Sequence, residues 1–136
     1  MPDITRADLS RYRFQKAEEM LSSAKRDITA KDYASANNRA YYAIFHAIRA
    51  VLALDGEDFK KHSAVIARFT LNYLKPEILP REYSKLIANA SLIRNRSDYE
   101  DFYICSVADT NALFSGAEAF CADIGKYLEK RYGDER

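Results

Sequence analysis

The segment YASANNRAYYAIFHAIRAVLAL, residues 33–54, limits the fold of this chain more than any other stretch. Its apolar side chains recur at three- and four-residue steps and form one broad stripe: Ala40, Tyr41, Ile44, Phe45, Ile48, Val51 and Leu52. Asp32 stands where a helix cap is expected, and Gly56 is suited to a left-handed stop. We therefore expect an amphipathic helix over residues 33–54.

Further amphipathic segments precede and follow this helix. Thr5 and Asp8 have the spacing of a capping box that opens a helix over about 6–28. A third helix is expected over about 63–74, and a fourth over about 80–98 with Pro80 in its first turn. Ser106 and Asp109 mark the start of a last helix, whose apolar face comprises Val107, Leu113, Phe114, Ala117, Phe120, Cys121, Ile124 and Leu128. The sequence predicts an all-α, up-and-down bundle of four or five helices, forming a single domain over residues 1–136.

The charge balance excludes a strongly basic nucleic-acid footprint. Twenty-one Lys and Arg residues face twenty Asp and Glu residues, a net charge of +1. Contact with RNA would therefore need a local patch, for example one built by two subunits. No Gly-rich phosphate loop, HExxH, GxSxG or acidic metal cluster is present, so we expect neither a metal nor a cofactor.

The two cysteines and the apolar runs bear on the cellular compartment. Cys105 and Cys121 lack the spacing of a zinc site or a redox pair, so we expect free, buried thiols in a reducing cytoplasm. No apolar run approaches membrane-spanning length. We expect a soluble, cytoplasmic protein.

Each of the two histidines allows two interpretations. Arg39, Tyr42, His46 and Arg49 step by three, four and three along one helix face. They predict either a strip that contacts phosphates and bases or a polar border that packs against a neighbouring helix or subunit. His62 lies in the short basic run KKHS. This run is either a solvated helix flank or a source of positive charge for a cleft.

A second chemistry-bearing stretch is SLIRNRSDYEDFY, residues 91–103. Arg94 and Asp98 are four positions apart, as are Arg96 and Glu100. Such pairs stabilise an exposed helix by about 0.2–0.5 kcal/mol each, which is one sufficient explanation of these charges. The alternative is a binding or catalytic site.

The stretch NNRAYYAIFHAIRAVLALDGEDFKKHSAVIARF, followed by LIRNRSDYEDF, resembles the HEPN family of prokaryotic helical-bundle proteins. The resemblance extends from about residue 10 to 130 and includes a YYA-x-FHA helix, a KHS turn and an R-x4-Y motif. It implies a five-helix up-and-down bundle that commonly dimerises. It also implies pairing with a minimal nucleotidyltransferase in a toxin–antitoxin-like module, whose active HEPN members are metal-independent ribonucleases.

The resemblance also assigns site residues. Arg94 falls on the arginine of the family's active-site motif, Asn95 on its polar neighbour, and Tyr99 where the catalytic histidine would stand. Histidine, with a pKa of about 6.5, transfers protons near neutrality, whereas tyrosine, at about 10, is a poor base there. Arg94 and Tyr99 are also about 140° apart on an ideal helix, so they converge only where the helix bends or ends, or across two subunits. The resemblance further makes Tyr99 and Tyr103 candidate acceptors of AMP from the partner nucleotidyltransferase.

These observations predict a HEPN-domain component of such a module, a homodimer that binds RNA or nucleotide in a cleft between subunits. The expected binding residues are Arg94, Asn95, Arg96, His46, Arg49, Tyr42 and His62. Arg94 and Tyr99 are the candidate catalytic residues for ribonuclease activity. The competing hypotheses are a non-catalytic subunit that positions the nucleotidyltransferase or its substrate, and a bundle that holds a small nucleotide ligand.

Overall fold

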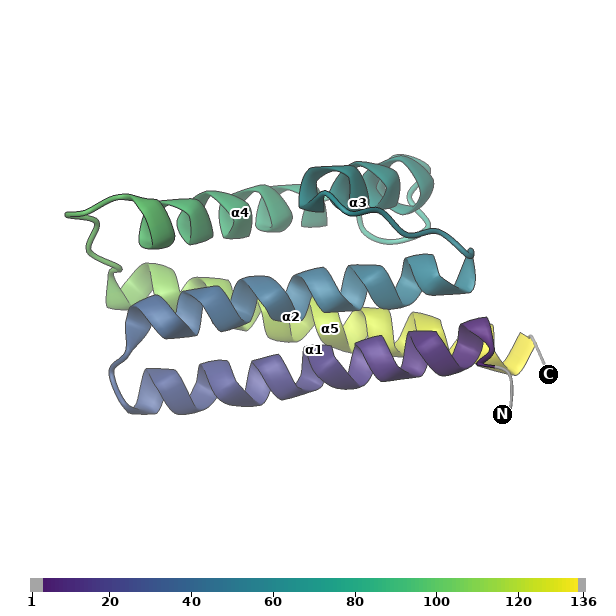
Figure 1. The fold of residues 1–136 in the computed structure, drawn as a ribbon, viewed down its shortest axis with the longest axis horizontal. Coiled ribbons are helices and arrows are strands. Elements are labelled where there is room, and N and C mark those ends of the chain that lie inside the picture. Colours follow the sequence, from purple (N-terminus) through teal and green to yellow (C-terminus); the bar gives the residue numbers. More distant parts are fainter. Residues whose placement is uncertain (1–3, 135–136) are drawn as a thin grey trace.

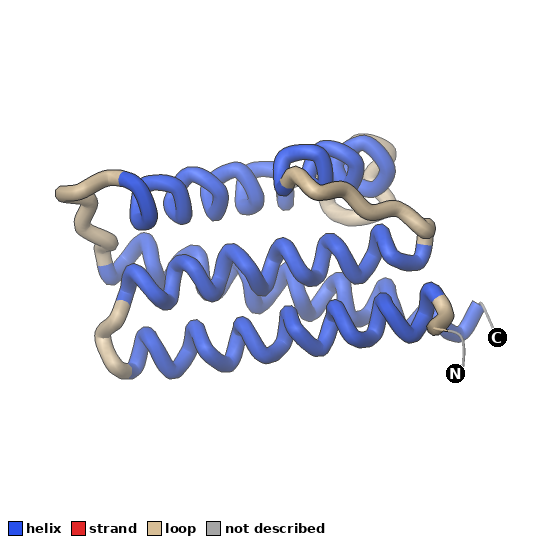
Figure 2. The backbone as a smooth tube through the Cα atoms, in the orientation of Figure 1, coloured by secondary structure: helices blue, strands red, loops and turns tan. Residues whose placement is uncertain are grey.

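The computed structural model describes residues 4–134, and within them the regular structure is entirely helical. Four long helices run up and down, antiparallel to their sequence neighbours, with a short helical segment between the second and third of them (Figures 1 and 2). The elements are α1 (Arg6–Thr29), α2 (Tyr33–Leu54), α3 (His62–Phe69), the π-helical turn η1 (Thr70–Leu74), α4 (Tyr83–Tyr99) and α5 (Val107–Asp134). This arrangement confirms the predicted all-α bundle.

Helix α2 lies at the centre of the bundle and contacts α1, α3, α4 and α5. Every residue of its predicted apolar stripe is buried. It also buries alanines on other faces, among them Ala43, Ala47 and Ala50, whose small side chains let neighbouring helices approach closely. Phe69 and Phe120 are the largest fully buried side chains and meet edge to face. A helix that is apolar around most of its circumference is stable only when it is surrounded.

The predicted helix boundaries are confirmed wherever a side chain caps the helix. The Thr5 hydroxyl accepts a hydrogen bond from the Asp8 amide, and the Asp8 carboxylate accepts one from the Thr5 amide, at 3.0 and 3.2 Å. Asp32 caps α2 through the Ser35 amide. Gly56 has the left-handed φ of 72° that was expected after α2. The Ser106 hydroxyl accepts from the Asp109 amide at the start of α5.

One predicted boundary is wrong. Helix α4 begins at Tyr83 and not at Pro80. The amides of Tyr83, Ser84 and Lys85 bond to the carbonyls three residues earlier, so Pro80 opens a tight turn that precedes the helix. The third helix starts at His62 and widens at Thr70 into a π-helical turn, in which the Lys75 amide bonds to the Thr70 carbonyl. Its overall extent, 62–74, agrees with the prediction.

The cysteines are both free, but only one is in the core. Cys121 is buried on α5, and burial raises the pKa of its thiol to about 12. Cys105 is partly exposed in the connection between α4 and α5, with its Sγ 3.2 Å from the Ser97 hydroxyl. The expected burial of Cys105 is therefore wrong, because the core ends where α4 ends. Across residues 4–134, none of the helices has the length and apolar character needed to cross a membrane.

Candidate functional site

Two adjoining pockets lie beside α2 and meet at His62. The first, which we call the Arg94 pocket, has a volume of about 460 Å³ and is lined by Tyr41, His62, Ser63, Ile66, Ala67, Ser91, Arg94 and Asn95. The second, the Arg49 pocket, has a volume of about 340 Å³ and is lined by Phe45, Arg49, Asp58, Phe59, Lys60 and His62. Four of the predicted site residues, Arg94, Asn95, His62 and Arg49, therefore line these two neighbouring pockets, which share His62. We refer to the two pockets together as the groove; it is formed by α2, α3, α4 and the segment that precedes α3.

Arg94 is held against two aromatic rings. Its guanidinium carbon lies 4.9 Å from the ring centre of Tyr41 and 5.4 Å from that of Tyr42. Its Nε is buried and has no hydrogen-bond partner among the described residues, and the Asp98 carboxylate lies 3.7 Å away. A planar guanidinium packed on aromatic faces keeps its N–H edge for an anion such as a phosphate.

His62 is positioned by two contacts with α2. Its Nδ1 lies 3.0 Å from the Tyr41 hydroxyl, and its ring stacks on Phe45 with centres 4.0 Å apart. Burial lowers the pKa of His62, and the charges of Arg94 and Arg49 lower it further, so the imidazole is neutral at neutral pH. Burial also raises the pKa of Tyr41, which keeps its hydroxyl protonated.

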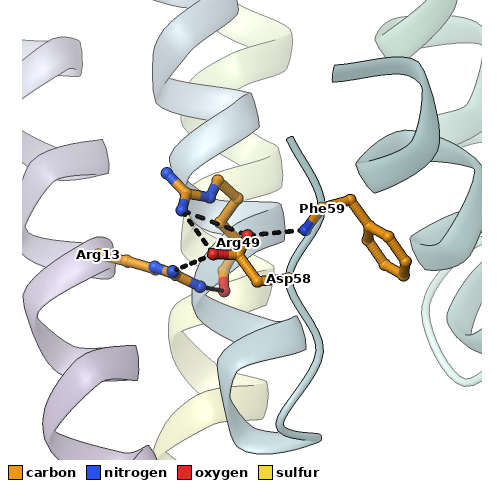
Figure 3. A network of polar contacts seen from close by, with 4 residues as sticks. All are labelled: Arg13, Arg49, Asp58 and Phe59. Atoms are coloured by element: carbon orange, nitrogen blue, oxygen red, sulfur yellow. Dashed lines mark hydrogen bonds and ion pairs between the residues drawn. The ribbon is translucent and has the colours of Figure 1, made fainter. Parts of the chain in front are cut away.

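The Arg49 pocket contains a three-member charge network. Figure 3 shows Arg13 from α1 and Arg49 from α2 converging on the carboxylate of Asp58, which also accepts the Phe59 amide. The Arg13–Asp58 and Arg49–Asp58 ion pairs measure 3.0 and 3.2 Å. Arg13 also donates to the backbone carbonyl of Arg49. One carboxylate faces two guanidinium groups, so this end of the groove has a local excess of positive charge.

His46 and Tyr42 lie next to this groove but line neither pocket. His46 is partly buried, contacts the rings of Tyr42 and Phe45, and has a buried Nδ1 without a hydrogen-bond partner among the described residues. Burial, followed by the nearby charges of Arg49 and Lys16, lowers its pKa to about 4. For His46, these surroundings favour the interpretation as a polar border that packs against the rest of the bundle, whereas Arg49 of the same strip lines the Arg49 pocket. Tyr42 contacts the guanidinium of Arg94 with its ring.

Three of the predicted site residues lie away from the groove. Arg96 is exposed and forms an ion pair of 3.9 Å with Glu100. Tyr99 is the last residue of α4 and is 77% exposed. Tyr103 is partly exposed in the following loop, where partial burial raises its pKa. Both predicted four-residue charge pairs on α4 form, since Arg94 and Asp98 also approach each other.

The end of α4 and the loop to α5 carry several exposed apolar side chains. Side chains that are at least half exposed cluster along the sequence here: Leu92, Tyr99, Phe102, Ile104 and Val107. Phe102 is 96% exposed. Figure 2 shows this connection at the far end of the bundle, opposite the start of α1. We call Tyr99, Phe102, Ile104 and Val107 the apolar tip.

Sequence reasoning missed two contributors to the groove. Tyr41 was assigned to the apolar stripe alone, although its hydroxyl and ring contact both His62 and Arg94. The available signal was the phenol itself, because a buried tyrosine usually finds a partner for its hydroxyl. Asp58 had no local signal, since its partners Arg13 and Arg49 are 45 and 9 positions away. Within residues 4–134, no three His, Cys, Asp or Glu side chains are placed to hold a metal ion.

Comparisons with a family model and with known proteins agree on the family of this chain. The model of the HEPN domain matches residues 10–134. The chain is 30% identical over 118 residues to a "UPF0332 protein" of Thermotoga maritima, covering 87% of this chain and 89% of that protein. It is 39% identical over 83 residues to "Putative toxin MJ0605" of Methanocaldococcus jannaschii, covering 61% of this chain and 62% of that protein, which is less than two thirds of its length. A second protein of that organism, "Putative toxin MJ0142", is 27% identical, covering 84% of this chain and 78% of that protein. The chain thus belongs to the HEPN domain family.

Proposed function

We propose that this protein is the HEPN-domain component of a toxin–antitoxin-like module and binds RNA or a nucleotide in the groove around Arg94. The observation that carries the proposal is the position of this guanidinium, fixed by Tyr41 and Tyr42 at the wall of the Arg94 pocket. Arginine pairs with phosphate through two parallel hydrogen bonds. Two relatives with "Putative toxin" in their names support the module assignment. Endoribonuclease activity that needs no metal is part of the proposal.

Pairing of two subunits would strengthen such binding. The chain has a net charge of only +1, whereas a dimer that joins two grooves would place two copies of Arg94 and Arg96 near one ligand. Sedimentation analysis tests this part of the proposal. A protein that stays monomeric at micromolar concentration and still binds RNA tightly would show that one groove is sufficient.

RNA binding can be measured by titrating a labelled single-stranded oligonucleotide at fixed salt. Arg94→Ala should weaken binding about 10- to 100-fold, because hydrogen bonds to charged groups contribute about 1.5–3 kcal/mol. Lys85→Ala is the matched control, since it removes one positive charge from an exposed position of the same helix that lines neither pocket. It should change binding less than threefold. Equal losses in the two variants would show that Arg94 contributes only bulk charge.

Arg94→Lys separates charge from geometry. Lysine keeps the positive charge but lacks the planar group that stacks on Tyr41 and Tyr42. We expect it to recover only part of the affinity. In cells, induced expression of the wild type should arrest growth, and Arg94→Ala should relieve the arrest.

The second candidate function is a non-catalytic subunit that positions a minimal nucleotidyltransferase or its substrate. The apolar tip favours it, because exposed apolar clusters mark protein interaction sites. The combined variant Phe102→Ser and Ile104→Ser should abolish copurification with a nucleotidyltransferase encoded beside this chain and leave RNA binding unchanged. Absence of growth arrest by both the wild type and Arg94→Ala would support this function over the toxin.

The proposed nucleotidyltransferase partner suggests a covalent modification of this protein, the transfer of AMP to a tyrosine. Tyr99 is 77% exposed, and its hydroxyl is therefore accessible to an enzyme that transfers AMP. Incubation with the partner and ATP should add the mass of AMP to the peptide that contains Tyr99 and Tyr103. An unmodified peptide would refute this part of the proposal.

A further inference from the structure

We infer that His62, oriented by Tyr41, is the catalytic residue that accepts the proton when a ribose 2′-hydroxyl attacks the adjoining phosphate of a bound RNA strand. The inference rests on the proposed function, since it requires that RNA occupy the groove. It assigns to a residue of α3 the proton transfer that the family resemblance had put at the position of Tyr99. It places the base and Arg94 in the same pocket of one subunit.

The first argument is the way the imidazole is held. Phe45 covers one ring face at 4.0 Å, and the Tyr41 hydroxyl lies 3.0 Å from Nδ1. These two contacts fix the orientation of the ring and occupy one of its nitrogens. The other nitrogen, Nε2, makes no hydrogen bond to the residues that the structure describes, and His62 borders both pockets. In the tautomer whose Nδ1–H donates to the Tyr41 oxygen, Nε2 carries the free lone pair and is the atom that can accept a proton from a ligand in the groove.

The second argument is that His62 and Arg94 are organised by the same side chain. The guanidinium of Arg94 packs on the ring of Tyr41, and the hydroxyl of Tyr41 contacts His62. Both residues line the Arg94 pocket. A phosphate bound by Arg94 in this pocket would therefore share the pocket with the imidazole. Tyr99, by contrast, is at the exposed end of α4 and does not line this pocket.

The third argument is the position of His62 between the two pockets. The Arg49 pocket supplies the aromatic ring of Phe59 and the charges of Arg49 and Lys60. Aromatic rings beside cationic groups suit a nucleotide of single-stranded RNA. A strand that places one nucleotide in each pocket puts the connecting phosphodiester at His62.

The chemical step needs no redox partner. Nε2 of neutral His62 takes the proton of the 2′-hydroxyl, and the 2′ oxygen forms a bond to phosphorus. The bond from phosphorus to the 5′ oxygen breaks, and that oxygen leaves with the electron pair and takes a proton from water. The products are a 2′,3′-cyclic phosphate and a 5′-hydroxyl end. The imidazolium then loses its proton to solvent.

The surroundings of His62 support this role. Tyr41 and Arg49 face it from α2, Arg94 faces it from α4, and Lys60 and Lys61 precede it in the chain. Burial and the two arginines lower the pKa of His62 below 6.5, so the base form is present at neutral pH. The cleavage rate should fall on acidification through this lowered pKa, with a midpoint below 6.5.

The test compares cleavage and binding of the same labelled single-stranded RNA by the full chain. His62→Gln should lower the cleavage rate at least 100-fold, a typical contribution of general-base catalysis, and should lower RNA affinity at least tenfold less than it lowers the rate. His62→Ala should regain activity when imidazole is added to the solution. Tyr41→Phe should lower the rate and move the acidic limb of the pH profile, because it removes the hydroxyl partner of Nδ1. Mass spectrometry should find the 2′,3′-cyclic phosphate.

Three outcomes would overturn the inference. One is a wild-type protein that binds RNA through Arg94 and does not cleave it, which leaves the proposed binding function intact. Another is a His62→Gln variant that cleaves at the wild-type rate, with Tyr99→Phe inactive instead. The last is a parallel loss of binding and cleavage in His62→Gln without rescue by imidazole, which would make His62 a phosphate ligand. Failure of the proposed function is separate, since it appears as unchanged RNA binding in Arg94→Ala.

Discussion

Asp58→Asn tests whether the burial of Arg13 determines the strength of the network in Figure 3. The substitution keeps the shape of the side chain and removes its charge. The side chain of Arg13 is only 9% exposed, so it cannot replace the lost partner with bulk water, whereas Arg49 is 28% exposed and can do so in part. The cost should therefore come mainly from Arg13.

The magnitude follows from these exposures. A hydrogen bond to a charged group contributes about 1.5–3 kcal/mol, and an exposed ion pair less than about 1 kcal/mol. Asp58 is itself 52% exposed, which weakens the pair, and asparagine still offers one oxygen as an acceptor. We expect a loss of about 1.5 kcal/mol in the free energy of unfolding. Urea denaturation measures it directly.

Glu77→Gln provides the matched control. Glu77 forms an ion pair of 3.2 Å with Arg81, but both side chains are more than 60% exposed, at 63% and 62%. The same change of carboxylate to amide should cost less than about 0.5 kcal/mol there. A double-mutant cycle with Arg13→Met should then assign most of the Asp58 effect to its pair with Arg13. Equal losses in Asp58→Asn and Glu77→Gln would refute the reasoning, because burial of Arg13 would then have no effect.

The pH dependence of the free energy of unfolding provides a second test of the network formed by Arg13, Arg49 and Asp58. Burial raises the pKa of Asp58, but the guanidinium groups of Arg49 and Arg13 lower it more, and the net shift is downward from 3.8. A carboxylate with a lowered folded-state pKa stabilises the protein above its unfolded pKa and loses that effect as the pH falls through the folded value. The difference between wild type and Asp58→Asn should stay constant from pH 5 to 7 and shrink below about pH 4.

Three further predictions concern the core, a cap and a buried histidine. Phe120→Ala should lower the free energy of unfolding by about 3–5 kcal/mol, measured in urea, because a fully buried ring leaves a cavity. Ser106→Ala should cost about 1 kcal/mol in a thermal melt, since the Asp109 amide loses its acceptor at the start of α5. His46 should titrate near pH 4 by NMR. Between pH 6.5 and 4 the unfolded chain then binds a proton at this histidine that the folded chain does not, so the free energy of unfolding should fall over this range. His46→Gln should remove this pH dependence. A His46 midpoint near 6.5 would contradict the burial argument.

The sequence by itself determined the helices and most of their ends. The stripe of α2, the Thr5–Asp8 capping box and the pair Arg94–Asp98 act between residues three or four positions apart, so their geometry is set as soon as a helix forms. Pro80 marks the limit of such reasoning. Its local preference suits both a helix start and a tight turn, and the structure has the turn.

Only the tertiary structure decided which residues form the site. Periodicity shows which face of a helix is apolar, but it does not show what that face meets. Tyr41 was assigned to the core by its spacing, and the fold turned it into the contact between His62 and Arg94, which lie 21 and 53 positions further along the chain. The family resemblance put Tyr99 at the position of the catalytic histidine, and in the structure α4 ends there and leaves Tyr99 exposed. The helices are determined by local contacts, whereas the groove depends on how α2, α3 and α4 pack.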